Sequence, residues 1–172
     1  MPNTWFQWHN QIITAGARVL DLACGAGVEA IAAAEQGAEV VAVDADTESL
    51  KAAEAAASKA HVTVQWVQAD LTTDPVPDGP YDVVMAFSYL DRAQMPRFLD
   101  AVKPGGHFLL ETFLEQQREL GWGPTADEHL LKSGELWTLV EPFEIVLARE
   151  VLEVLDGRSR AVASILAQRP LV

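Results

Sequence analysis

RVLDLACGAGVEAIAAAEQGAEVVAVDA, residues 18–45, contains a strand, a turn, a helix and a second strand in one run. RVLDLA (18–23) and EVVAVDA (39–45) are apolar runs of strand length. Between them, GVEAIAAAEQGA (27–38) is rich in Ala and is ended by Gly37, as a helix would be. Two strands joined by a helix predict a βαβ unit and therefore a parallel sheet.

The alternation of strands and helices continues along the chain. The Pro- and Gly-rich residues 72–80 are too short for a helix, so we expect an irregular crossover there. After residue 113 the pattern weakens, first to a polar loop or short helix and then to a helical stretch broken near Gly134. The sequence predicts further strands over 61–69, 81–87 and 107–113, and further helices over about 46–60 and 92–103.

The C-terminal part predicts an antiparallel pair of strands. Residues 143–155 and 160–169 are apolar runs separated by Asp156-Gly157, a strong hairpin signal. The expected fold class is therefore α/β, with a Rossmann-like doubly wound sheet that is mostly parallel and ends in an antiparallel hairpin. We expect one domain over residues 1–172, with residues 1–17 and their aromatic cluster as a lid segment.

Composition limits the possible partners and location. The 25 Asp and Glu against 12 Lys and Arg give a net charge of −13, which disfavours a grip on nucleic-acid phosphates or on an anionic membrane. The single cysteine, Cys24, cannot form an internal disulfide. No secretory signal and no transmembrane run is visible. We therefore expect a cytoplasmic protein without nucleic-acid or membrane partners, and a monomer or homodimer.

Each predicted strand places polar groups at its carboxyl end, where an open α/β sheet binds ligands. The first strand leads into a small-residue turn that lets a ligand approach backbone N–H groups and a helix N-terminus. A carboxylate 19 residues after Gly25 can accept from both ribose hydroxyls. The groups at this edge are Asp21, the turn Ala23–Gly27, Asp44, Asp70, Ser88, Tyr89, Glu111 and Thr112. Together they predict a nucleoside-type ligand.

An NAD site is one alternative. Residues 25–30 match G-x-G-x-x-A, and Asp44 lies about where an NAD-binding acid should. However, Asp21 interrupts the apolar strand before the glycine turn. Neither Asp70 nor the antiparallel C-terminal strands have a role in the NAD-binding fingerprint. An NAD-dependent oxidoreductase is therefore the less favoured hypothesis.

VLDLACGAG (19–27) resembles the first signature of class I S-adenosylmethionine-dependent methyltransferases. VVAVDAD and VQADL resemble the second and third signatures, and YDVVMAFSYL and KPGGHFLLETF resemble the fourth and fifth. The resemblance implies the strand order 3-2-1-4-5-7-6. Within the family, SYLDR, ETF, HLL and SGEL are similar to small bacterial methyltransferases of the tellurite-resistance and thiopurine type.

The resemblance also implies roles for the residues at the sheet edge. The methionine part of the cofactor would be held by the backbone of Ala23, Cys24, Gly25 and Gly27, with Asp21 nearby. The ribose hydroxyls would be bound by Asp44 beside Ala45, and the adenine amino group would donate to Asp70 beside Leu71. The methyl-donor end would be lined by Phe87 and Ser88. Two departures stand out. Ala26 replaces the usual Thr, and Ala23 replaces the usual first glycine, which is tolerable if its φ is negative.

Four residues are candidates for catalysis: Tyr89, Arg92, Glu111 and His129. Arg92 could neutralise an anionic acceptor, or form a surface salt bridge to Asp91 or Asp100. His129 could act as a base near neutral pH, or be a structural histidine. The scattered histidines and single cysteine predict no metal site.

The expected function is transfer of a methyl group from S-adenosylmethionine to a small-molecule acceptor, with S-adenosylhomocysteine as the product. A soft nucleophile such as a thiol or a chalcogen oxyanion-derived species would need little more than a slot, since the sulfonium methyl group is already activated. A non-catalytic S-adenosylmethionine-binding regulator stays open as an alternative because no convincing general base is visible.

Overall fold

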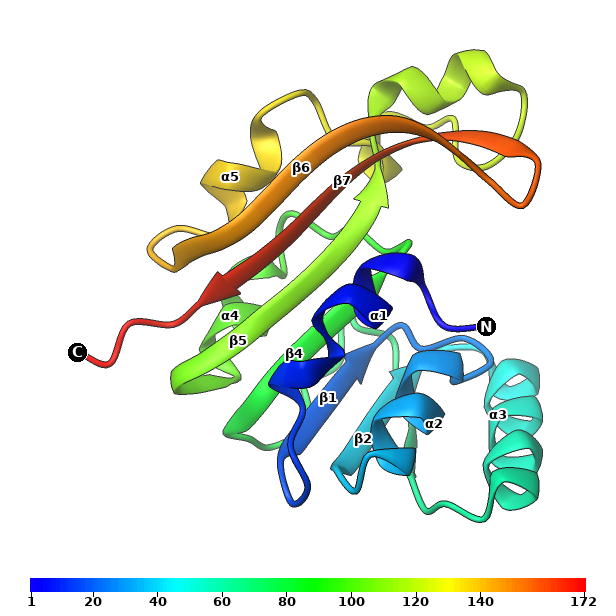
Figure 1. The fold of residues 1–172 in the computed structure, drawn as a ribbon, viewed down its shortest axis with the longest axis vertical. Coiled ribbons are helices and arrows are strands. Elements are labelled where there is room, and N and C mark those ends of the chain that lie inside the picture. The colour runs from blue at the N-terminus through cyan, green and yellow to red at the C-terminus, as the bar shows by residue number, and fades with distance from the viewer.

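The computed structural model describes all 172 residues and confirms the α/β architecture (Figure 1). One seven-stranded sheet has the order β3-β2-β1-β4-β5-β7-β6, as the resemblance implies. Strands β1 to β5 run parallel, and β7 is antiparallel to both of its neighbours. The strands are β1 (Arg18–Leu22), β2 (Glu39–Asp44), β3 (Gln65–Gln68), β4 (Tyr81–Phe87), β5 (Val102–Phe113), β6 (Glu144–Leu155) and β7 (Arg158–Gln168).

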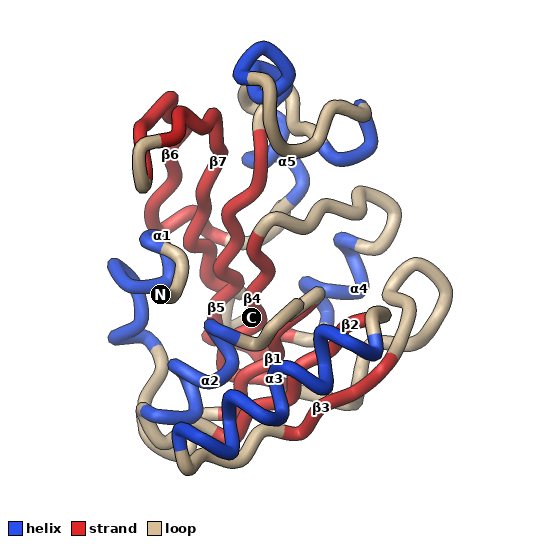
Figure 2. Tube along the Cα trace, turned by 90° about the vertical axis from the view of Figure 1, so that its right-hand side faces the viewer, coloured by secondary structure: helices blue, strands red, loops and turns tan.

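Helices cover both faces of the sheet. Figure 2 shows α1 and α2 on one side and α4 and α5 on the other. The α-helices are α1 (Thr4–His9), α2 (Val28–Glu35), α3 (Thr47–Ala60), α4 (Met95–Asp100) and α5 (Glu135–Leu139), and three 3₁₀ turns cover Asn10–Ile12, Glu115–Leu120 and Asp127–His129. None of the helices has the length and apolar character that crossing a bilayer requires.

The sheet separates two hydrophobic cores. Val19 and Val83 pack with α1, α2 and α3, whereas their chain neighbours Leu20 and Val84 pack with α4 and α5 on the opposite face. Successive side chains of a strand point to opposite faces, so a strand buried on both faces must be apolar at consecutive positions. The unbroken apolar runs of the sequence therefore indicate central strands correctly.

Three elements differ from the predicted ones. β3 begins only at Gln65, because His61 takes a left-handed conformation (φ 58) and ends α3. β5 begins early, because Val102 pairs with Tyr81 before a register shift, and this shortens α4. The predicted helix after Glu128 is reduced to a 3₁₀ turn and the short α5. The hairpin is confirmed, with Asp156 and Gly157 both at positive φ as its tight turn requires.

The first strands of the sheet end side by side. Leu22 pairs with Val43 on β2 and with Ala86 on β4, so the residues that follow these strands meet at one edge. In Figure 1 the N-terminus lies on the side toward which the arrows of β1 and β5 point. The N-terminal segment is thus brought to the edge where the predicted site residues gather.

Gly27 provides a test of the packing behind this edge. It has φ +72, and a Cβ there would lie 2.5 Å from a ring atom of Trp66 on β3. We expect Gly27→Ala to lower the free energy of unfolding by about 2 kcal/mol, since backbone strain and overlap add. Gly134→Ala is the matched control, because Gly134 also precedes a helix at positive φ (+77) but has open space around it. Equal losses in urea unfolding of the two variants would contradict the tight contact with Trp66.

Candidate active site

The turn after β1 is built to expose its backbone. Ala23, Gly25 and Gly27 all have positive φ, at 54°, 52° and 72°. The amide of Gly25 donates to Oδ2 of Asp44 at 2.7 Å, which ties the turn to the end of β2. A Cβ on Gly25 would meet no atom within 4 Å, so space is open above the turn. A ligand can therefore approach this backbone closely.

Ala23 departs from the condition set by the sequence. An alanine fits the first position of the turn without strain if its φ is negative. In the structure the φ of Ala23 is +54. An L-residue with a Cβ is strained in the left-handed region by roughly 1–2 kcal/mol. The turn therefore keeps the backbone shape that a glycine would favour, although the residue at this position is an alanine.

Two carboxylates that are not buried lie at the ends of β2 and β3: Asp44 is the last residue of β2, and Asp70 follows β3. Asp44 accepts from the amides of Gly25 and Asp46, one on each oxygen, and a carboxylate oxygen has a second lone pair for a further donor. Oδ1 of Asp70 accepts from the amide and hydroxyl of Thr72 at 2.9 and 2.6 Å, and these bonds lower the pKa of Asp70. Both side chains can therefore accept from a ligand at this edge.

Asp21 is the buried acid of the site. Its side chain is 2% exposed, and Oδ2 has no hydrogen-bond partner. Burial raises the pKa of Asp21 well above its usual range, and the nearby carboxylates of Glu29 and Asp44 add to this. A buried polar atom without a partner costs stability. A cationic group bound near the turn would supply the missing interaction.

Cys24 lies inside the same turn as a packing residue. It is 8% exposed, and burial raises the pKa of its thiol, with Asp21 and Asp44 adding to the shift. The thiol therefore stays protonated and unreactive.

The end of β4 carries a second strained residue. Ser88 has φ +57, and its amide donates to the carbonyl of Glu111 at 2.8 Å. Phe87 precedes it and makes an edge-on contact with Phe6 of α1, with ring centroids 6.3 Å apart. Left-handed non-glycine residues are held in place only when their surroundings determine them, and they occur often at functional sites.

Glu111 does not have a free carboxylate. Its Oε1 accepts from Nδ2 of Asn3 and pairs with Arg160, both at 2.9 Å. Its Oε2 accepts from the hydroxyl of Ser164 at 2.6 Å and pairs with Arg149 at 3.1 Å. With four partners and 2% exposure, this side chain cannot reach a substrate. The structure contradicts the catalytic role predicted for Glu111.

Arg92 is also fully engaged. Its Nε and Nη2 bond the carboxylate of Glu135 at 2.5 and 2.9 Å, so neither Asp91 nor Asp100 is its partner. Its other donors reach three backbone carbonyls at 2.7 to 3.3 Å, those of Asp127, Glu128 and Leu130. All five N–H groups of the guanidinium are therefore used. Arg92 therefore has no free donor with which to neutralise an anionic acceptor, and its side chain holds the loop before α5.

Two adjoining hollows lie beyond Ser88, of about 300 and 360 Å³. Tyr89, Leu90 and His129 line both. The smaller is completed by Ser88, Phe113 and Pro124, and the larger by Thr72, Asp91, Arg92, Ala93 and Glu128. Burial raises the pKa of Tyr89 to about 12, with Asp91 and Asp70 adding to the shift, so the hydroxyl is neutral at physiological pH. His129 is exposed in its 3₁₀ turn.

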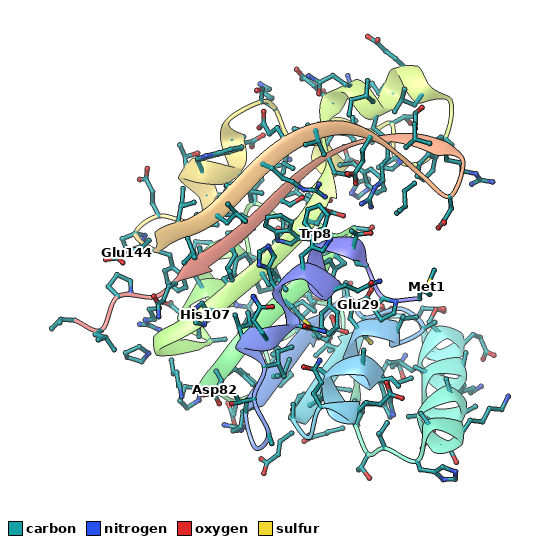
Figure 3. The ribbon with its side chains drawn as sticks, viewed as in Figure 1. Met1, Trp8, Glu29, Asp82, His107 and Glu144 are labelled. Atoms are coloured by element: carbon teal, nitrogen blue, oxygen red, sulfur yellow. The ribbon has the colours of Figure 1, made fainter.

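Asn3 is a residue of the site that the sequence did not reveal. Its side chain caps α1 and donates to Glu111, while its backbone amide donates to Glu29 at 2.7 Å. Figure 3 shows Glu29 beside the N-terminal segment and Trp8 farther toward the C-terminal strands. An Asn before a short amphipathic helix is a recognisable cap signal. The sequence does not indicate that Asn3 contacts Glu29 and Glu111, because these residues are 26 and 108 positions away.

No group of three or more His, Cys, Asp or Glu side chains lies close enough together to hold a metal ion. The site therefore consists of a backbone turn, several carboxylates and a hollow with a tyrosine and a histidine.

Comparison with known proteins identifies the family. A model described as a methyltransferase domain matches residues 19–106, just over half of the chain. The match contains the turn, Asp44, Asp70 and Ser88. The chain belongs to this methyltransferase family. The predicted class I S-adenosylmethionine-dependent methyltransferase family, the enzyme class and the cofactor are thereby confirmed.

A ribosomal protein L11 methyltransferase from Thermus thermophilus is 38% identical over 107 residues, which are 61% of this chain and 42% of that protein. The chain spans between 36% and 51% of the length of the curated relatives compared. Among solved structures, TehB from Haemophilus influenzae matches with a TM-score of 0.76 at 18% identity, covering 94% of this chain and 62% of that one. A methyltransferase from Methanosarcina mazei matches with a TM-score of 0.73 at 20% identity, covering 95% and 97%. Such identities show a shared fold.

The relatives also correct the partner prediction. The sequence predicts a small-molecule acceptor and neither a nucleic-acid nor a membrane partner. Several relatives are named for ribosomal protein L11, which is a protein substrate. The restriction to small molecules is therefore wrong and is not kept below.

Ala23→Gly tests the strained turn. We expect it to raise the free energy of unfolding by about 0.5 to 1 kcal/mol, because relief of the left-handed strain exceeds the entropy that glycine adds to the unfolded chain. Ala26→Gly is the control, since Ala26 lies in the same turn without positive φ and should lose about 0.5 to 1 kcal/mol. Urea unfolding measures both, and a loss of stability in Ala23→Gly would contradict the strain.

Glu111→Gln tests whether this residue supports the structure or the chemistry. We expect the free energy of unfolding to fall by about 3 kcal/mol, because Arg149 and Arg160 lose the buried one of their two carboxylate partners and keep only the more exposed Glu153. Glu144→Gln, at the exposed start of β6, should leave stability unchanged. Unchanged stability of Glu111→Gln together with lost methyl transfer would restore the catalytic role.

Proposed function

We propose that this protein transfers the methyl group of S-adenosylmethionine to a nucleophile that enters through the hollows beside Tyr89 and His129. The observation that carries this proposal is the unpartnered, buried Oδ2 of Asp21 beneath an open left-handed turn. S-adenosylmethionine carries positive charge on its sulfur and its amino group, which suits a buried carboxyl that lacks a partner.

The cofactor contacts proposed here are those that the family resemblance implies, and the open turn and the free acceptors at this edge support them. The methionine part is held by the backbone of Ala23, Cys24, Gly25 and Gly27. The ribose hydroxyls donate to Asp44, beside Ala45, and the adenine amino group donates to Asp70, beside Leu71. The methyl-donor end is lined by Phe87 and Ser88. The cofactor supplies a methyl group that is already activated for displacement. The protein's contribution is therefore mainly positioning and exclusion of water.

On the acceptor side, two of the four predicted catalytic residues remain in the proposal. Tyr89 presents a neutral hydroxyl that can orient the acceptor, and His129 can accept its proton. Arg92 keeps His129 in place by binding the carbonyls of the two residues before it and the one after it. His129 thereby stays at the hollow without needing partners of its own.

We further propose that residues 1–172 act as one domain in which residues 1–17 cover the cofactor. Asn3 supports this, because it links the first turn of α2 to the end of β5 across the site edge. Trp5 and Phe6 behind it are each 1% exposed, so the segment is packed firmly on the sheet.

A non-catalytic cofactor binder is the second candidate function, and the strained Ala23 is the observation that favours it. Both candidate functions use the same cofactor-binding site. Formation of S-adenosylhomocysteine in the presence of an acceptor separates them, because a pure binder forms none.

Asp44→Asn tests the cofactor-binding site. The substitution keeps an oxygen for the amide of Gly25. It replaces the oxygen that accepts from the amide of Asp46, and it removes the negative charge of the group that would accept from two ribose hydroxyls. We expect affinity for S-adenosylhomocysteine to fall at least about tenfold, since charge-assisted bonds are the stronger ones. Isothermal titration calorimetry measures this, with Glu54→Gln on the exposed face of α3 as the control. Unchanged affinity would refute the ribose role, and no binding by the unaltered protein at millimolar ligand would refute the proposed function.

A further inference from the structure

The charges around the acceptor hollows are unbalanced. Asp91 and Glu128 line the larger hollow, and Arg92 is the one cation that shares it. All five donors of Arg92 are used by Glu135 and by backbone carbonyls. The carboxylate of Asp91 has a single contact, from the amide of Gln94 at 3.2 Å, and the exposed carboxylate of Glu128 has no hydrogen bond or ion pair. The larger hollow, called the acidic mouth below, thus carries negative charge that no free cation of its own lining neutralises.

The smaller hollow adjoins it along Tyr89, Leu90 and His129 and has no acidic residue in its lining. Ser88, Tyr89 and His129 are its polar members, and its other walls are Leu90, Phe113 and Pro124. Tyr89 is neutral, so this part offers no cation to an anionic acceptor. An acceptor in these adjoining hollows therefore lies near two uncompensated carboxylates and against apolar walls.

We propose that the methyl acceptor is an amine, which approaches as its ammonium form and reacts as the neutral amine. This inference rests on the proposed function and assigns the acceptor class of the same site. The uncompensated carboxylates of Asp91 and Glu128 attract the ammonium ion and raise its local concentration. The apolar walls of the smaller hollow favour the neutral form, because desolvation disfavours the charged form of an amine.

The step balances in atoms and charge. The ammonium ion first gives a proton to His129, which leaves a lone pair on nitrogen. That pair forms the new N–C bond while the S–C bond of S-adenosylmethionine breaks, and sulfur keeps the bonding electrons. The products are a methylated ammonium ion and S-adenosylhomocysteine, and His129 returns its proton to solvent.

The same charges disfavour anionic acceptors. An oxyanion, a carboxylate or a thiolate would be repelled at the mouth and would find no free guanidinium inside. A soft anionic acceptor needs little more than a slot, but in these hollows it would meet two carboxylates and no free guanidinium, because the donors of Arg92 are used. The likeness to TehB at 18% identity concerns the fold and not this charge pattern.

An acceptor panel tests the inference on the full-length protein. The probes are 2-phenylethylamine, 2-phenylethanethiol and 3-phenylpropionate, which share an aryl group and differ in the reacting group. A short lysine peptide and its acetyl-lysine form test whether the amine is carried on a protein. S-adenosylhomocysteine formation gives kcat/KM, and we expect the amine or the lysine peptide to exceed the thiol and the carboxylate at least about tenfold, the effect of electrostatic steering.

The outcomes are separable from those of the proposed function. Turnover of the thiol or the carboxylate at least equal to that of the amines overturns the amine inference but leaves methyl transfer intact. The amine inference also fails if the protein binds S-adenosylmethionine yet methylates neither amine. Absence of cofactor binding refutes the proposed function itself.

Two variants test the acidic mouth directly. Asp91→Asn keeps an oxygen for the amide of Gln94, and Glu128→Gln removes a charge without a structural partner. We expect each variant to raise KM for the amine about threefold to fivefold while kcat stays unchanged. This change corresponds to the interaction energy of one exposed charge pair. Glu54→Gln on α3 is the control for net charge. Unchanged KM in both mouth variants, or the same rise in Glu54→Gln, overturns the inference.

Discussion

The buried carboxylate of Glu111 is the interaction on which the arrangement of the site depends. It stands at the carboxyl end of β5 and pairs with Arg149 on β6 and Arg160 on β7. The same carboxylate accepts from Asn3, which caps α1. A single buried charge thus joins the parallel part of the sheet, the antiparallel hairpin and the N-terminal helix. Because it is fully partnered, it can be buried without the cost of an isolated ion.

Arg92 has a comparable position on the opposite face. Its guanidinium joins the loop after β4 to the segment that carries His129, with Glu135 of α5 as its counter-ion. Two residues whose polarity and location suggested chemistry are therefore supports for the groups beside them. Sites that must hold reacting groups within fractions of an ångström need such supporting contacts. What remains is a backbone turn and three acids for the cofactor, and a tyrosine, a histidine and two further acids for the acceptor.

Much of the fold follows from local sequence patterns. The apolar runs indicate the central strands, and Asp156-Gly157 indicates the hairpin, because only a few residues tolerate the turn's positive φ. The gathering of Asp44, Asp70 and Ser88 follows from the rule that parallel strands end at one edge. These predictions succeed because each depends on residues close in the chain or on a general property of sheets.

The remaining features depend on contacts between distant residues. Arg92 and Glu135 are 43 residues apart, and no local pattern links them. The sign of φ at Ala23 is set by how the turn is held against β2, so the residue type alone predicts it incorrectly. The early start of β5 likewise depends on Tyr81 pairing with Val102 across the neighbouring strand. Polar residues at a sheet edge suggest function, but only their partners show which of them are free.

The inert state of Cys24 has a practical consequence. It is the single cysteine of the chain, it is buried in the turn, and burial raises the pKa of its thiol. A cysteine introduced on the exposed side of α1 would thus be the one thiol that reacts readily with a maleimide dye. Single-site labelling of the N-terminal segment is then feasible without altering the turn.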